Sequence, residues 1–498
     1  MAITFLCLLI LFILHIFTNQ FLHRIRNLPP SPFFSLPIIG QLYLLKRPLH
    51  RTLLDISRRH GPILFFWFGF RPVLVVSSPS AAEECLSKND IVFANRPHLI
   101  GGKYLGYNYT SLLWAPYGEH WRNLRRISSL EIFSTHRLQT LSSIRVDEVR
   151  TLIRRLYNTK NDVVDMKTEF FELMFNIMMR MIAGKRYYGE DVAESEEAER
   201  FREIQEETFR LSSKTNLGDF LRMVKWAGLS KGLENRMKEL QSKRDAWMQS
   251  LIEEHRKQSK KDAKKTMIEV LLSLQQKEPH YYKDEYIRGL MLVLLLAGTE
   301  GSINTMEWLL SLLLNNPECL QRAQTEIDDV VGRSNRILEE SDLAHLPYLR
   351  SLIHETLRMY PPGPLLIPHE SSADCHVGGF RVPAGTTLFV NVWAIQNDPT
   401  VWVDPEKFNP GRFGSEGEGW FFKWMPFGAG RRRCPGEGLG LRVVGLAVGS
   451  LIQCFEWESV GGECIDMREG VGLTLPKAVP LHALCRPRSK VAHLLPQI

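Results

Sequence analysis

The spacing of apolar residues predicts that most of the chain is helical. Between about residues 115 and 330, apolar side chains recur every three or four positions among many charges, most clearly over 197–209 and 233–255. This is the period of amphipathic helices that pack on one face. We therefore expect a helical body in this part of the chain.

Two β-rich runs, 63–68 and 73–76, are separated by Gly69-Phe70-Arg71-Pro72 and predict a hairpin. Shorter strand-like pieces lie at 379–382 and 386–392. The expected fold class is mainly α with small β-sheets.

One apolar run is followed by residues that do not suit it. Residues 290–295 are all apolar and predict a buried helix, yet 296–305 read LAGTEGSINT. There Gly298 and Gly301 flank Glu300. Burying an unpaired carboxylate is costly, and glycine inside a helix costs about 1 kcal/mol relative to alanine. Unfavourable choices this close together indicate a functional site; a helix end with a glycine cap is the alternative.

The first 22 residues are apolar apart from a few polar positions and approach the length that crosses a bilayer. Arg24 and Arg26 follow, and positive flanks favour the cytosolic side. We expect residues 1–22 to be a transmembrane signal anchor that leaves the remaining chain in the cytosol. A cleaved signal peptide is the alternative, although no small-residue cleavage site follows.

Residues 23–41 are first basic and then rich in proline. Proline fixes φ and disfavours helix, so this segment is expected to be a stiff hinge that sets the distance between membrane and body. No low-complexity linker or internal repeat follows. Residues 42–498 are therefore expected to form one catalytic domain.

Composition excludes several classes of protein. The net charge of +7 is modest, and charged runs such as 260–265 are typical of solvated loops, so no nucleic-acid partner is expected. Eight cysteines without a C-x-x-C pair indicate neither a zinc site nor a disulfide framework. A reducing compartment fits this pattern best.

A glycine-rich stretch near the carboxyl end, FGAGRRRCPG at 427–436, carries the strongest chemical signal. Its glycines let the backbone approach a ligand, and the arginines beside Cys434 favour the thiolate. A thiolate is a strong axial ligand for haem iron. Arg432 has the planar guanidinium that matches a haem propionate. A structural cysteine in a basic surface loop is the competing interpretation.

This stretch resembles the F-x-x-G-x-R-x-C-x-G haem loop of the cytochrome P-450 superfamily, at Phe427, Gly430, Arg432, Cys434 and Gly436. Three further family motifs occur in the expected order. E-x-x-R is matched by 355–358, F-x-P-[DE]-R-F is resembled by 408–413 with Gly411 in place of the acid, and W-x-x-x-R is resembled by 121–125.

The resemblance implies roles for these residues. Cys434 would be the metal ligand of a haem b, with Trp121 and Arg125 at its propionates and His369 as a further contact. Glu355, Arg358 and Arg412 would form a buried ionic triad. The resemblance also implies the single-domain haem-thiolate fold behind its membrane anchor.

The hinge, YPPGP at 360–364 and GKRYYG at 184–189 resemble microsomal plant A-type members, most closely family eighty-one. Members of that family oxidise isoflavonoids, lignans, indolic compounds and other specialised metabolites. The resemblance thus implies an endoplasmic reticulum monooxygenase with a hydrophobic, aromatic substrate, which it hydroxylates with O2.

Residues 297–302, AGTEGS, resemble the family's [AG]-G-x-[DE]-T-[TS] in the helix that crosses the haem. Gly298 would permit a local opening of the helix, and Glu300 would be the acid of a proton relay. Thr299, Glu300, Gly301 and Ser302 are the expected catalytic positions. Gly301 replaces the usual threonine, and Ser302 is turned from it by about 100°.

The missing threonine leaves alternatives open. A water or a substrate hydroxyl would replace it in ordinary hydroxylation, whereas some plant relatives that lack it close methylenedioxy bridges or couple phenols. A reductase-independent haem-thiolate isomerase or dehydratase, and a non-catalytic membrane scaffold, are the other classes to be tested.

By resemblance, the substrate pocket draws on 98–110, 211–221, 291–301, 364–369 and 471–475. Tyr104, Tyr107 and Tyr109 are expected either to contact a phenolic substrate or only to cover a loop. No dinucleotide fingerprint is present, so electrons are expected from the membrane-bound NADPH-cytochrome P-450 reductase. Its acidic face would meet basic residues on the cysteine side: Arg122, Lys423, Arg431, Arg433 and Arg442.

Overall fold

A computed structural model describes residues 4–6, 14, 18, 20–159, 162–189, 196–212, 216–257, 266–332, 335–414, 420–472 and 474–497. Most of the expected anchor and the charged run 260–265 lie outside these residues, as do 213–215 and Leu473 of the expected pocket.

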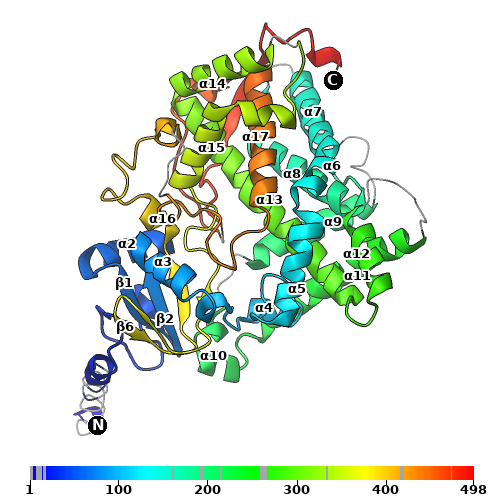
Figure 1. The fold of residues 1–498 in the computed structure, drawn as a ribbon. Coiled ribbons are helices and arrows are strands. Elements are labelled where there is room, and N and C mark those ends of the chain that lie inside the picture. Colours follow the sequence, from blue (N-terminus) through cyan, green and yellow to red (C-terminus); the bar gives the residue numbers. More distant parts are fainter. Residues whose placement is uncertain are drawn as a thin grey trace.

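Helices form the body of the molecule, and a smaller strand-rich part lies at one side near the amino terminus (Figure 1). The helices are α2 (Leu49–His60), α3 (Pro79–Glu83), α4 (Ile100–Tyr104), α5 (Glu119–Ile127), α6 (Thr135–Thr140), α7 (Ser142–Asn158), α8 (Met166–Ala183), α9 (Glu196–Ser212), α10 (Arg222–Trp226), α11 (Lys231–Lys257), α12 (Met267–Lys277), α13 (Asp284–Asn315), α14 (Pro317–Val330), α15 (Pro347–Met359), α16 (Val392–Gln396) and α17 (Glu437–Cys454). The two helices predicted from periodicity correspond to α9 and α11.

The largest sheet has the strand order β1-β2-β7-β4. Its strands are β1 (Ile63–Phe68), β2 (Arg71–Val76), β4 (His369–Glu370) and β7 (Thr387–Val390). The predicted hairpin is present as β1 and β2, but its turn is only Gly69-Phe70, because Arg71 and Pro72 already pair with Phe68 and Trp67. Pro72 is tolerated inside the sheet because pairing with β7 begins at Val73.

A second sheet has the order β3-β9-β8, with β3 (Val163–Asp165), β8 (Phe455–Ser459) and β9 (His482–Pro487). The short strands β5 (Cys375–Val377) and β6 (Phe380–Val382) form a separate hairpin. The expected strands at 379–382 and 386–392 correspond to β6 and β7.

The proline-rich hinge is not a free spacer. Gln41 N–H donates to the Trp67 carbonyl at 2.6 Å, Gly69 N–H donates to that of Ile39 at 3.1 Å, and Phe65 N–H donates to that of Pro30 at 2.9 Å. The segment therefore lies along the outer edge of β1 and covers hydrogen-bonding groups that an edge strand would expose.

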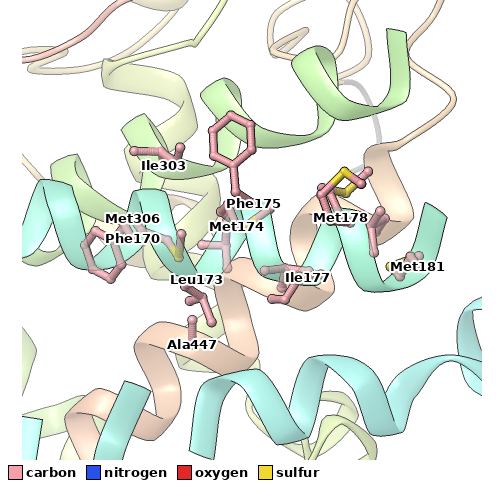
Figure 2. Packing of buried hydrophobic residues seen from close by; sticks show 14 of the residues in the cluster. Phe170, Leu173, Met174, Phe175, Ile177, Met178, Met181, Ile303, Met306 and Ala447 are labelled. Atoms are coloured by element: carbon pink, nitrogen blue, oxygen red, sulfur yellow. The ribbon is translucent and has the colours of Figure 1, made fainter. Parts of the chain in front are cut away.

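The main core forms where α8 and α17 pack against α13. Figure 2 shows Met174 and Met178 of α8 among Ile303 and Met306 of α13 and Ala447 of α17, all of them buried. Helices α13 and α17 are long and apolar enough to cross a membrane. Because half or more of the apolar stretch of each helix is buried inside the protein, we interpret both as core helices.

Helix α13 runs without interruption from Asp284 to Asn315. A helix end with a glycine cap at these positions is therefore wrong, whereas the expected local opening at Gly298 stays a prediction. A Cβ on Gly298 would lie 2.7 Å from Cε and 2.9 Å from Sδ of Met178. This glycine permits α8 and α13 to approach each other closely.

Candidate active site

The loop 427–436 leads directly into α17 and presents Cys434 at its end. Cys434 N–H donates to the Phe427 carbonyl at 2.9 Å and closes the loop. Gly428 and Gly430 have φ of 71° and 68°. A Cβ on Gly430 would also lie 2.4 Å from the Leu86 carbonyl oxygen, so only glycine fits there.

The Cys434 side chain is accessible, although protein surrounds it on most sides. Burial raises the pKa of the thiol, whereas hydrogen bonds from the backbone N–H groups of Gly436 and Glu437 and the charge of Arg125 lower it. The arginines next to Cys434 act elsewhere: Arg433 pairs with Glu437 at 2.7 Å. The expected support of the thiolate thus comes from α5 and the start of α17.

Arg432 of this loop and two arginines beside the loop, Arg96 and Arg125, have no acidic partner among the described residues. None of them forms an ion pair with a carboxylate in the described part of the chain, and each donates only to backbone carbonyls. Burial lowers the pKa of Arg432 to about 9 and that of Arg96 well below its usual range. The charge of Arg125 further lowers the pKa of Arg432, and that of Arg432 lowers the pKa of Arg96.

Buried cations without anions are unfavourable unless a ligand supplies the charge. The carboxylates of a haem would supply it, so the residues present fit that cofactor. No sequence motif pointed to Arg96; its contacts with the carbonyls of Leu113, Ile367 and Pro368 exist only in the folded chain.

Trp121 and His369, both expected at the propionates, have other partners. The Trp121 ring lies under the Arg432 guanidinium at 4.3 Å, and its indole N–H donates to the Leu112 carbonyl at 3.2 Å. His369 Nδ1 donates to the Phe93 carbonyl at 2.8 Å, which leaves a lone pair on Nε2 in the neutral ring. Burial lowers the His369 pKa, so the neutral form is favoured.

Glu355 on α15 joins the two arginines of the expected triad. Its carboxylate accepts two hydrogen bonds from Arg358, at 2.7 and 2.9 Å, and one from Arg412 Nε at 3.2 Å. Gly411, which replaces the usual acid, does not prevent these three residues from meeting. Its N–H donates to the Asn409 side-chain oxygen at 3.1 Å.

Residues 297–302, in which two glycines flank Glu300, lie on α13. Burial raises the pKa of Glu300, and Oε1 of Glu300 accepts a 2.7 Å hydrogen bond from the Thr474 hydroxyl, which lowers it. A Cβ on Gly301 would be 3.7 Å from Cβ of Pro362, an ordinary contact, so the position has room for a side chain.

The neighbouring hydroxyls do not take the place of the missing threonine. Thr299 is fully buried and donates to the Leu295 carbonyl at 2.9 Å, so the expected catalytic role of Thr299 does not fit. Ser302 Oγ is 3.4 Å from the Gly298 carbonyl and 4.0 Å from the Cβ position of Gly440 on α17. It therefore points toward α17.

Sequence comparison decides the family. The cytochrome P450 family model matches residues 29–482. The chain belongs to the cytochrome P450 family. It is 53% identical over 469 residues to cytochrome P450 81Q32 of Catharanthus roseus, covering 94% of this chain and 93% of the relative.

Two further relatives have more specific names. The P450 is 47% identical to the (+)-piperitol/(+)-sesamin synthase CYP81Q2 of Sesamum radiatum, covering 100% of this chain and 98% of the relative. It is 46% identical to an isoflavone 2'-hydroxylase of Glycyrrhiza echinata, covering 95% of both chains. The expected resemblance to family eighty-one is confirmed.

The fold agrees with a solved zebrafish cytochrome P450 bound to progesterone, with a TM-score of 0.79 and 27% identity over 89% of this chain and 100% of that chain. The expected mainly helical P450 fold is thus confirmed. The P450 is a monooxygenase with a haem-iron cofactor, and it uses a small substrate and a redox partner.

The three tyrosines expected near the P450 substrate are held by the protein. Tyr104 donates to Glu234 at 2.8 Å, Tyr107 to Asp245 at 2.5 Å, and Tyr109 to the Leu99 carbonyl at 3.0 Å. Their hydroxyls fasten the 98–110 loop, which supports the second of the two expected roles.

The basic residues expected to meet the reductase are only partly free to do so. Arg431 pairs with Asp90 at 3.0 Å and Arg442 with Glu340 at 3.3 Å, in addition to Arg433 with Glu437. Arg122 and Lys423 are exposed. The positive field of this P450 face is therefore weaker than its sequence suggests.

Proposed function

We propose that this P450 is a haem b enzyme of the endoplasmic reticulum membrane that hydroxylates a hydrophobic, aromatic plant specialised metabolite. A flavonoid, a lignan or a related phenolic is the proposed substrate class. The cluster of Arg96, Arg125 and Arg432 beside Cys434 carries the proposal. These cations require anions close to a thiolate, and the propionates of a haem would supply them. The names of the relatives that act on lignans and isoflavones support the substrate class.

In this proposal, Cys434 binds the haem iron and the three arginines bind the propionates. The ring of Trp121 keeps Arg432 in place, and Phe427, Gly430 and Gly436 shape the loop. Bound there, the haem supplies the redox chemistry that inserts oxygen from O2 into the substrate. His369 donates to a propionate only after gaining a second proton, which an adjacent anion favours.

Glu300 takes up and releases the protons that oxygen activation consumes. Its raised pKa suits this task, because a buried carboxyl with a pKa nearer neutrality exchanges protons more readily at cytosolic pH. Gly301 contributes no hydroxyl, so a water or a hydroxyl of the substrate completes the path in a hydroxylation.

The space at Gly301 favours oxidative ring closure, a methylenedioxy bridge or a phenol coupling, as the second candidate reaction. A relative named for sesamin synthesis is consistent with it. A reductase-independent isomerase or dehydratase is the alternative class. The two classes differ in whether turnover requires NADPH and reductase.

Residues 1–22 are proposed to be the membrane anchor, with 23–41 as the hinge and 42–498 as the catalytic domain. Arg24 and Arg26 are exposed at the end of the described helical turn that precedes the hinge. Electrons are proposed to come from NADPH-cytochrome P-450 reductase in the same membrane.

The experiment uses full-length protein in microsomes with this reductase. The reduced, carbon monoxide-bound form should show the absorbance band of thiolate ligation, and Cys434→Ser should lose it. Flavonoids, lignans, xanthone precursors and terpenoids are then screened by the haem absorbance shift and by turnover with and without NADPH. No thiolate band, or turnover without NADPH, would contradict the proposal.

A further inference from the structure

The segment that enters the last sheet lies along α13 and is fastened to it by side chains. Its described residues, 466–472 and 474–481, include the exposed Val471 and lead to β9. The contacts are Thr474 Oγ1–Glu300 Oε1 at 2.7 Å, Asn304 Nδ2–Thr474 Oγ1 at 2.9 Å, Trp308 Nε1–Leu475 O at 2.8 Å and Leu481 N–Glu307 Oε1 at 2.9 Å.

The four α13 residues in these contacts share one face of the helix. Apart from the adjacent last pair, Glu300, Asn304, Glu307 and Trp308 are three, four, seven or eight positions from one another. Asn304, Glu307 and Trp308 are buried. Helix α13 therefore uses the hydrogen-bonding groups of this face to fix the segment alongside Glu300.

The contact between Thr474 and Glu300 has a defined direction. The Asn304 amide nitrogen can only donate, so Thr474 Oγ1 accepts its hydrogen bond. The Thr474 hydroxyl hydrogen is then free to point at Glu300 Oε1, at 2.7 Å. Asn304 orients the hydroxyl, and the hydroxyl orients the carboxyl group.

We propose that Thr474 is a positioning residue for Glu300, through which the segment around Val471 and Thr474 controls proton delivery. The proposal rests on the proposed role of Glu300 as the relay acid. Without the Thr474 hydroxyl, the Glu300 side chain loses its fixed rotamer. A substrate that displaces the segment would do the same, so proton delivery depends on how the segment is seated.

Two measurements on full-length holoenzyme test this. Hydrogen–deuterium exchange reports whether residues 466–481 stay fastened to α13. Peroxide released per NADPH consumed, with the reductase, with (+)-piperitol as probe and again without organic substrate, reports failed proton delivery. The variants are Thr474→Val, Thr474→Ser, Asn304→Leu and Glu300→Gln, with Thr325→Val on the exposed face of α14 as the matched control.

Thr474→Val should raise exchange of the segment roughly five- to tenfold and raise the peroxide ratio about threefold or more. Asn304→Leu should give a smaller change of the same sign. Thr474→Ser and Thr325→Val should leave both readouts unchanged. Glu300→Gln keeps an acceptor for Thr474, so exchange should stay low while the peroxide ratio rises.

The outcomes separate the two proposals. If Glu300→Gln raises the peroxide ratio and Thr474→Val does not, Thr474 has no positioning role, but Glu300 remains the relay acid. If neither variant changes the ratio, both the relay role and the positioning role are wrong. Loss of the carbon monoxide band in Thr474→Val alone, with Thr474→Ser intact, would mean a structural role and would also overturn the proposal.

Discussion

Arg358 donates two hydrogen bonds to Glu355, three residues before it on α15, and neither side chain is accessible to solvent. Arg358 also donates to the carbonyls of Gln396 and Pro405, at 2.7 Å each. The pair therefore holds α15 against the end of α16 and the segment that follows it. A buried pair of this kind is costly to break, because the remaining charge has no water around it.

Replacement of Arg358 by leucine should consequently cost about 3–5 kcal/mol of stability and greatly reduce the yield of folded P450. The matched control is Arg350→Leu on the exposed side of the same helix. The urea midpoint and the carbon monoxide band of both variants are the measurements. Equal stability of the two variants would show that the pair does not support the fold.

Gly430 is predicted to be irreplaceable for two independent reasons, its φ of 68° and the Leu86 carbonyl at the Cβ position. Gly430→Ala should reduce haem content by at least about tenfold, because the strain displaces the loop that carries Cys434. Gly232→Ala, which meets nothing within 4 Å in α11, is the control. Haem per polypeptide by pyridine haemochrome would measure the difference.

Arg96 tests whether the unpaired arginines hold an anionic cofactor. Arg96→Leu should accelerate transfer of haem to apomyoglobin by about 10- to 100-fold, because a charge-assisted hydrogen bond is lost. Arg59→Leu on the exposed side of α2 is the control. Unchanged haem transfer would place the propionates elsewhere.

Gly301 distinguishes the two candidate reactions. The nearest atom to its Cβ position is 3.7 Å away, so Gly301→Thr should fold normally. If the P450 hydroxylates its substrate with a water in place of the threonine, Gly301→Thr should lower peroxide release. If the P450 closes rings, the same variant should lower the ratio of ring-closed to hydroxylated product. Gly301→Ala controls for volume. The same ratios in all three proteins would remove any special role for the glycine.

Glu469 predicts a pH dependence of stability. Its carboxylate binds His50 at 3.0 Å and Arg51 at 2.7 Å, and although burial acts in the opposite direction, these partners lower its pKa to about 2. A carboxyl group whose pKa is lowered by folding stabilises the fold at pH values above its pKa in the unfolded chain, which is near 4.5. This stabilisation disappears as the pH falls toward 2. Glu469→Gln should therefore cost about 1–3 kcal/mol at pH 7, and less below about pH 4.5.

Comparison of urea midpoints at pH 7, 5 and 4 would measure this. Between pH 7 and 5 the gap between the two proteins should stay nearly constant. Asp55→Asn, on the exposed side of α2, should show no gap at any of these pH values. A gap that widens as pH falls would have the wrong sign for the assignment.

The features that depend on short segments were predictable from the sequence. Helical period located α9 and α11, alternation and turn residues located the β1–β2 hairpin, and FGAGRRRCPG marked the cysteine loop, because all the atoms involved are within a few residues of one another. The motifs also identify Glu355, Arg358 and Arg412, which meet in the folded chain. The turn between β1 and β2 is shorter than the sequence predicts, since pairing across a hairpin extends into residues that local propensity assigns to the turn.

Contacts between distant segments were decided only by the tertiary structure. Arg96 joins a site centred on a residue 338 positions away, and Thr474 reaches Glu300 across 174 positions. Two of the three tyrosines of the 98–110 loop, Tyr104 and Tyr107, donate to acids of α11. The role of Gly298 depends on Met178 of another helix, and the partner of Thr299 depends on which side of α13 is buried. Local sequence determines which elements form and which chemical groups they carry. The packing of those elements determines which groups meet, because burial and hydrogen bonding are satisfied by neighbours in space.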